Sequence, residues 1–423
     1  MDGNRRSAEC GVQNAENGRP AIPHSEFRIQ HSPRAAHHYV LVSAFVVALC
    51  MPMAGMVLRL APQRALTENR KLADFPSLAL GRHDFRQYLR QVQTYLGDQF
   101  GFRAELIHWY HIVKTRWLGV SSSEQVVIGK KGWLFYAGDQ ALSDFRCIAP
   151  FTQAELESWR RLLERREEWL RRRGIRYLVV IAPNSHTIYP EYLPDWATRL
   201  HQKSRLDQLI AHLRANSRIQ ILDVRPALLE GKRRGRLYMR TDTHWNDHGA
   251  FIAYEQIMGG LGRWFPALES QTIGDYNVTS IPVPGGDLAA LVDAQDIFRE
   301  ERIRLVPRLP ARAKREVIQA QGTSSDPYIL SLTVSRVDRP DPWASRPGAG
   351  LPRAVMIHDS FGIGLIPFLA EHFSRTLYVS VTLHHYFPAQ LIDKERPDVV
   401  IEESIERSLM ALPNESLDAL SAD

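Results

Sequence analysis

Two short stretches of the sequence carry side chains whose types and spacing suit nucleophilic catalysis. In TDTHW, Asp242 stands two residues before His244, so on an extended segment both side chains point to one face and the carboxylate can meet the imidazole. In MIHDSF, Ser360 stands where an apolar run ends and a helical pattern begins, which exposes a hydroxyl at the edge of a sheet. We therefore predict that His244 removes the proton of Ser360, that Asp242 orients His244, and that backbone N–H groups near the serine stabilise an oxyanion.

Both stretches also have structural interpretations. An Asp-x-His pair is often a helix cap or a surface hydrogen bond, and a serine before a helix is often a plain cap. His244 and His248 are four residues apart, and with a nearby aspartate they would suit zinc if both lay on one helix. Asn246 or Asp247 is the expected cap of the following helix, which leaves His244 outside it. We therefore predict no metal and no cofactor.

A basic run, GKRRGR, precedes the first stretch and carries the prediction for substrate binding. Arg233, Arg234 and Arg240 are predicted to hold an acidic polymer near the serine. Tyr238 and Trp245 are predicted to bind the same substrate with their aromatic rings. The alternatives are a solvated hairpin face for the arginines and core packing for the aromatic residues.

Alternating strand and helix patterns beyond residue 174 indicate an α/β fold. The apolar runs IRYLVVIAP, IQILDV, RAVMIHDSF, RTLYVS and PDVVIEE read as strands, and helices are expected at about 152–174, 198–215 and 247–261. Apolar runs without polar alternation are what a parallel sheet covered by helices on both faces requires. The fold class predicted is a three-layer α/β/α domain with a parallel sheet.

The chain divides into a sequence of predicted segments. Residues 1–38 read as a disordered tail, 39–58 as a transmembrane helix, and 59–120 as a linker and helical stalk with helical spacing from about 84 to 117. Residues 121–423 form the α/β domain, in which 266–350 is rich in Pro, Gly, Asp and Arg and is expected to be an irregular insertion with a few strands.

The predicted span, YVLVSAFVVALCMPMAGMVL, has no charge and the length of a helix that crosses a membrane. A cleaved signal peptide is the alternative, but its apolar region is typically shorter, so we predict an uncleaved anchor. Arginines and lysines lie on both sides of the span, so their distribution leaves the orientation open.

Composition excludes some classes of protein. The net charge of +6 suits an acidic partner, but the sequence has no zinc-finger spacing or RNP signature, so we predict no binding of nucleic acid. Three scattered cysteines are too few for a disulfide framework.

The order of motifs resembles the AlgJ and AlgX group of polysaccharide O-acetyltransferases. Besides TDTHW and HDSF, the resemblance includes ENRKLADFP, YLGDQFGFR, GKKGWLFY, APNSHTIYPEYLP, GGDLA and PDVVIEESIER, from about residue 68 to 407. It implies a circularly permuted SGNH-hydrolase-like fold, with Asp242 and His244 as acid and base and Ser360 as nucleophile. Ser185 and His358 depart from the pattern, since relatives often carry Lys and Gly or Arg there. The short stretch after Ser360 leaves no room for the carbohydrate-binding module of AlgX, so an AlgJ-like architecture is expected.

The resemblance also implies a function. We expect an O-acetyltransferase that moves acetyl through an acetyl-serine to hydroxyls of an exopolysaccharide, alginate-like or other, during export. The expected location is the inner membrane, single-pass, with the catalytic domain in the periplasm. A membrane-bound O-acyltransferase is the expected donor partner, beside other polysaccharide export proteins. The alternatives are an acetylesterase with the same triad and a non-catalytic scaffold of the export machinery.

Overall fold

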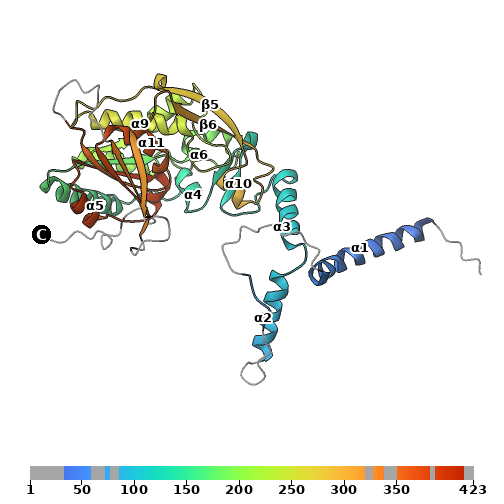
Figure 1. Ribbon diagram of the computed structural model, residues 1–423. Helices are drawn as coiled ribbons and strands as arrows, with labels where there is room; N and C mark the ends of the chain where they lie inside the picture. Colours follow the sequence, from blue (N-terminus) through green and yellow to red (C-terminus); the bar gives the residue numbers. More distant parts are fainter. Residues whose placement is uncertain are drawn as a thin grey trace, which may run out of the picture. The chain divides into compact units, whose positions relative to one another are not determined.

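A computed structural model describes most of the chain beyond the N-terminal tail (Figure 1). The described residues are 33–58, 72–76, 85–319, 326, 328–337, 350–381 and 386–413. They fall into two compact units, 1–105 and 106–423. Most of the predicted disordered tail and much of the predicted linker lie outside the described residues, and the predicted segment boundaries stay predictions.

The first unit contains the apolar N-terminal helix. Helix α1 (Pro33–Leu58) includes a stretch from His37 to Met56 of 20 residues with a mean hydropathy of 2.0. Its length and apolar character are consistent with a single-pass membrane anchor. Helix α2 (Phe85–Asp98) follows, and the Asp98 carboxylate accepts a hydrogen bond of 2.9 Å from the backbone N–H of Ala73.

The helical stretch predicted from about 84 to 117 is interrupted. It forms α2, then α3 (Arg103–Ile112), which continues as one π-helical segment, η1 (Val113–Trp117). Between α2 and α3, Phe102 has a φ of 57°. A left-handed residue cannot continue a right-handed helix, so the chain breaks there.

A hairpin follows as predicted from GKKGWLFY. Strands β1 (Val126–Ile128) and β2 (Leu134–Tyr136) pair antiparallel. In their turn φ is positive at Lys131 (54°) and at Gly132 (78°), and at position 132 the glycine adopts this conformation without strain.

The central sheet has seven strands in the order β4-β3-β11-β9-β10-β8-β7. Their bounds are β3 Arg176–Ala182, β4 Ile221–Asp223, β7 Ala313–Gln319, β8 Ile329–Val337, β9 Arg353–His358, β10 Arg375–Val381 and β11 Val399–Ile405. The first five strands are parallel, as predicted, whereas β8 runs antiparallel to β10 and β7 antiparallel to β8. The antiparallel pair comes from the segment predicted as an irregular insertion, and it extends one edge of the parallel sheet.

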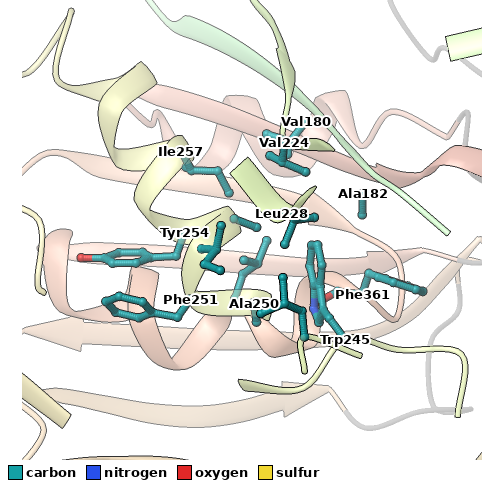
Figure 2. Close-up of a cluster of buried hydrophobic side chains, with 14 of the residues drawn as sticks. Val180, Ala182, Val224, Leu228, Trp245, Ala250, Phe251, Tyr254, Ile257 and Phe361 are labelled. Carbon is teal, nitrogen blue, oxygen red and sulfur yellow. The ribbon is translucent and has the colours of Figure 1, made fainter. Parts of the chain in front are cut away.

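Helices cover both faces of this sheet, which confirms the predicted α/β/α layers (Figure 1). One face carries α8 (Arg225–Gly231), α9 (Asp247–Leu261) and α11 (Ile366–Leu369), and the other carries α5 (Gln153–Arg172), α7 (Arg205–Asn216) and α12 (Ala389–Glu395). Strand β3 alternates between the two cores, since Val180 packs in the first and Val179 in the second. Figure 2 shows Val180 in the first core with Phe251 and Tyr254 of α9.

Local signals set the ends of these helices. Thr152 and Glu155 form the predicted capping box of α5, and the chain leaves that helix at Gly174, with a φ of 75°. Helix α7 begins later than predicted, at Arg205 rather than near residue 198, because Ser204 and Asp207 form a second capping box.

The insertion positions the site described below. Strands β5 (Tyr276–Val283) and β6 (Glu300–Pro307) pair antiparallel as a separate two-stranded sheet, and α10 (Asp287–Leu291) lies between them in the chain. The remaining short helices are α4 Ala141–Phe145, α6 Ser185–Ile188, η2 Lys130–Gly132, η3 Pro190–Tyr192, η4 Ile273–Asp275, η5 Gly362–Gly364, η6 Ala370–His372 and η7 Glu406–Met410.

Candidate active site

Ser360 lies in the turn that leaves β9 at the carboxyl edge of the parallel strands, and its side chain is exposed. The preceding carboxylate holds this turn: Asp359 accepts hydrogen bonds from the N–H of Phe361 at 2.8 Å and from the N–H of Ile405 at 2.7 Å. The second bond ties the serine turn to the end of the neighbouring strand β11. The hydroxyl is therefore presented on a turn with little freedom to move.

Close packing beneath the turn requires a glycine after Phe361. A Cβ on Gly362 would lie 2.4 Å from the Cβ of His358 and 2.8 Å from Oε2 of Glu403. Burial lowers the pKa of His358, and burial, followed by the charge of Asp359, raises the pKa of Glu403 well above its usual range. Burial therefore favours the neutral form of His358, and the prediction that this departure from the family pattern does not remove the nucleophile stays a prediction.

The three predicted catalytic residues form one hydrogen-bonded chain. His244 Nε2 lies 2.8 Å from Ser360 Oγ, and His244 Nδ1 lies 2.7 Å from Asp242 Oδ1. The N–H of His244 also donates to Asp242 Oδ1 at 3.0 Å, so the carboxylate fixes both the backbone and the ring. This is the geometry of a nucleophile, a base and an orienting acid.

A loop that the sequence did not single out as part of the site supports Asp242. Its Oδ2 accepts a hydrogen bond from the N–H of Asp287 at 3.2 Å. The Asp287 carboxylate in turn accepts from Thr243, at 2.8 Å from the backbone N–H and 2.5 Å from the hydroxyl. Asp287 belongs to GGDLA, one of the stretches that carry the family resemblance, which is the signal that could have found it.

A buried carboxylate from β6 holds the other end of the TDTHW segment. Glu300 Oε2 accepts from the N–H of Arg240 at 2.6 Å, and from the N–H and hydroxyl of Thr241 at 3.0 and 3.1 Å. Arg236 pairs with the same carboxylate. The β5–β6 insertion thus positions the acid and base of the site.

The charges around His244 favour its protonated form. Burial acts to lower the pKa of His244, but the hydrogen bond and charge of Asp242, with the charges of Asp287 and Asp359, outweigh it and raise the pKa above 6.5. Burial acts to raise the pKa of Asp242, and its bonds to His244 outweigh that and lower it. The pair therefore stabilises an imidazolium, the state that a base reaches after taking a proton.

The geometry favours the triad over a zinc site built on two histidines. Asn246, one of the two residues predicted to cap α9, is its N-cap. Its side chain accepts hydrogen bonds from the N–H groups of His248 at 3.0 Å and Gly249 at 3.1 Å. His244 consequently lies before the helix, outside the i, i+4 geometry. Asp242, His244 and Asp287 are the one cluster of potential ligand atoms within the described ranges, but both ring nitrogens of His244 already make hydrogen bonds.

An open cavity of about 750 Å³ borders His244 and Ser360. Its wall includes three arginines from the insertion and the sheet edge: Arg302, Arg304 and Arg315. Arg304 pairs with Asp247 at 3.1 Å. Arg302 and Arg315 both line the cavity and form no ion pair with an acidic residue within the described part of the chain.

The predicted basic residues line a different hollow. Arg233, Arg234 and Arg240 border a depression of about 710 Å³ that includes Tyr192 but not Ser360. Arg233 pairs with Glu230 at 2.8 Å. The structure therefore does not bring these arginines to the serine cavity, and their role in substrate binding stays a prediction.

The two predicted aromatic contacts lie in the core. Tyr238 has no exposed surface and donates a hydrogen bond of 2.6 Å to the carbonyl of Pro183. Trp245 is 5% exposed, and its Nε1 donates a hydrogen bond of 3.1 Å to the carbonyl of Phe361. Figure 2 shows the two side chains next to each other. Trp245 borders the serine cavity, whereas burial leaves Tyr238 no ring face for a sugar. Ser185 is also buried.

A parallel sheet between helices, with a serine at one strand exit hydrogen-bonded to the histidine of an Asp-x-His segment, is the arrangement of an SGNH-hydrolase-like domain. The family model described as "SGNH hydrolase-like domain, acetyltransferase AlgX" matches residues 126–326. This match and the similar proteins described below confirm the resemblance to the AlgJ and AlgX group. Asp242 and His244 lie within the matched range, and Ser360 follows it.

Similar proteins carry related names. "Probable alginate O-acetylase AlgJ" of Pseudomonas syringae pv. tomato is 24% identical over 201 residues, 47% of this chain and 48% of that protein. The protein of the same name from Azotobacter vinelandii is 30% identical over 204 residues, again 47% and 48%. The chain thus spans about half the length of the curated relatives it matches. The solved structure of Bacillus cereus PatB1 has a TM-score of 0.49 and 16% identity, and it covers 69% of this chain and 98% of that chain.

Proposed function

We propose that this protein is a polysaccharide O-acetyltransferase that carries the acetyl group on Ser360. The observation that carries the proposal is the chain of hydrogen bonds from Asp242 through His244 to Ser360, at 2.7 and 2.8 Å. The names of the similar proteins support acetyl as the group and a polysaccharide as the acceptor.

In the first half of the reaction, Ser360 Oγ attacks the carbonyl carbon of an acetyl donor while His244 Nε2 takes the hydroxyl proton. The tetrahedral oxyanion needs N–H donors. The N–H of Phe361 already donates to Asp359, whereas the N–H of Ser360 has no acceptor among the described residues and is the candidate donor. Collapse breaks the bond to the leaving group, which takes the proton from His244, and leaves an acetyl-serine.

In the second half, a sugar hydroxyl takes the place of the leaving group. His244 Nε2 removes its proton, the sugar oxygen attacks the acetyl carbon, and the ester bond to Ser360 breaks. The proton returns from His244 to Ser360 Oγ, so the enzyme is regenerated. The product is an O-acetylated polysaccharide, alginate-like or other.

The membrane-anchor character of α1 supports a location at the inner membrane with the catalytic domain in the periplasm. In that setting, a membrane-bound O-acyltransferase is the proposed acetyl donor, and other export proteins would deliver the polymer. A reporter fused after Asp423 tests the topology: a periplasmic signal is expected, and a cytoplasmic signal would refute an export-linked role.

An acetylesterase is the second candidate, favoured by the exposure of Ser360 and by the openness of its cavity to water. Water and a sugar hydroxyl attack the same acetyl-serine, so the two functions differ only in the acceptor.

One assay separates the candidates. The full chain is incubated with an activated acetyl ester and alginate, and acetyl groups on the polymer and free acetate are measured by NMR. A transferase acetylates the polymer, and an esterase releases acetate alone. Loss of both products in Ser360→Ala, with both retained in Ser270→Ala at an exposed loop serine, is expected. Equal activity in the two variants would refute the proposed role of Ser360.

A further inference from the structure

The helical segment from Leu106 to Trp117 exposes its apolar side chains. The exposed fractions are 49% for Leu106, 62% for Trp109, 52% for Tyr110, 41% for Val113 and 80% for Trp117. The spacing of three, four and seven residues places the first four on one face of α3. The π-helical turn of η1 adds about one residue per turn, which keeps Trp117 on that face. We call these five residues the apolar stripe.

Polar side chains on the opposite side of the same segment contact the domain. His108 is buried, with Nδ1 3.2 Å from Asp293 and Nε2 3.4 Å from Asp296. His111 hydrogen bonds to Ser122. Helices that cover a domain usually bury their apolar face. Here the polar contacts fix the helix with its apolar stripe turned outward.

An outward apolar stripe of this kind marks a surface for a partner. Single exposed apolar residues are normal, but a contiguous row with two tryptophans and a tyrosine is not. Tryptophan and tyrosine are the residues enriched where a membrane meets water, because each has an apolar ring and a polar atom. Lys114, whose Nζ lies 4.9 Å from the Tyr110 ring centre, and Arg116 place cations beside the stripe. Lysine and arginine beside an apolar aromatic face are typical of helices that lie on anionic bilayers.

We infer that the apolar stripe docks on the surface of the phospholipid bilayer that holds α1. The inference rests on the membrane-anchor character of α1 and not on the proposed chemistry. The chain between Leu58 and Leu106 includes helix α2, which spans about 1.5 Å per residue, whereas an extended residue spans up to about 3.5 Å. The segment is long enough to let the stripe reach that bilayer. Tethering makes the docking intramolecular, so a weak interfacial contact suffices.

The test uses the full chain in vesicles of phosphatidylethanolamine and phosphatidylglycerol. Cys10→Ser and Cys50→Ala remove the two cysteines that precede Leu106 in the sequence, and the buried Cys147 stays. Trp117→Cys then receives an environment-sensitive fluorophore, and a nitroxide on the lipid chains acts as the quencher. The matched control is Arg171→Cys, at an exposed position in the last turn of α5 that is not part of the apolar stripe.

Docking predicts severalfold stronger quenching at position 117 than at position 171. Trp109→Ser with Val113→Ser should reduce quenching at 117 to the control level, whereas Leu229→Ser, at an exposed apolar residue of α8, should leave it unchanged. Equal, weak quenching at both labels would overturn the inference. Blue-shifted emission at 117 without lipid quenching would also overturn it, because protein rather than lipid would then cover the stripe.

Discussion

Gly286 lies directly against Asp242. A Cβ at position 286 would be 2.5 Å from both the Cβ and Oδ2 of Asp242, closer than non-bonded atoms approach. The φ of Gly286 is −75°, so space rather than backbone conformation requires the glycine. The carboxylate that orients His244 is thus positioned by the absence of a side chain on the neighbouring loop.

Gly286→Ala should therefore move Asp242 and misplace the imidazole. Misplacement by about 1 Å can cost on the order of 100-fold in rate, so we expect a loss of that size in kcat for hydrolysis of a small acetyl ester. Gly259→Ala in α9 is the matched control, since a Cβ there meets no atom within 4 Å. Equal kcat in the two variants would show that Asp242 does not depend on this contact.

The raised pKa of His244 predicts an acid limb in the pH profile. The base must be neutral, so kcat/KM should fall as the pH drops through a value above 6.5. The effect of His244 on the stability of the fold changes with pH in the opposite direction to its effect on kcat/KM. Because the folded pKa exceeds the unfolded one, protonated His244 stabilises the fold at low pH, and this contribution is lost as the pH rises through the folded pKa.

Asp287→Asn tests the source of part of this shift. The Asp287 carboxylate lies 3.6 Å from His244 Nδ1 and raises the pKa of that ring. Removing the charge should lower the pKa of His244 and move the acid limb of kcat/KM to lower pH. Asp195→Asn, at a residue 95% exposed elsewhere in the domain, should leave the limb in place. A limb that moves upward in Asp287→Asn would contradict the electrostatic account.

The parallel sheet and the catalytic residues could be predicted from the sequence because the patterns that indicate them are local. The Asp242–His244 spacing, the serine after an apolar strand and the Asn246 cap each occupy a few adjacent residues. Ser360 and His244 are far apart in the chain; their residue types and the place of Ser360 at the end of a strand predicted the pairing, and the family pattern implied it as well.

The rest depends on contacts between distant segments. Arg302 and Arg315 lie in a region whose composition indicates only irregular structure, and they reach the serine cavity because β6 and β7 fold beside it. No spacing in the sequence distinguishes them from Arg233 and Arg234, which the fold places in another hollow. The position of Tyr238 also depends on the fold. A tyrosine suits a sugar contact, but this ring is buried and cannot reach a ligand.

Arg302 and Arg315, which have no acidic partner among the described residues, predict that the serine cavity binds an anionic acceptor. Arg302→Glu with Arg315→Glu should raise the KM for alginate by about 10-fold or more, equivalent to about 1.4 kcal/mol, and leave hydrolysis of a small neutral ester unchanged. Arg233→Glu with Arg234→Glu is the matched comparison from the second hollow and should have the smaller effect on KM. The reverse order would make the second hollow the main site for the polymer.

The most direct test of the central claim is the mass of the protein after brief incubation with an activated acetyl ester. The account predicts one acetyl adduct, located on Ser360 by peptide sequencing and absent from Ser360→Ala. Asp242→Ala and His244→Ala should slow its formation by on the order of 10⁴-fold or more, since members of a triad act as a unit. An adduct on another residue, or full turnover by Ser360→Ala, would contradict the acetyl-serine mechanism.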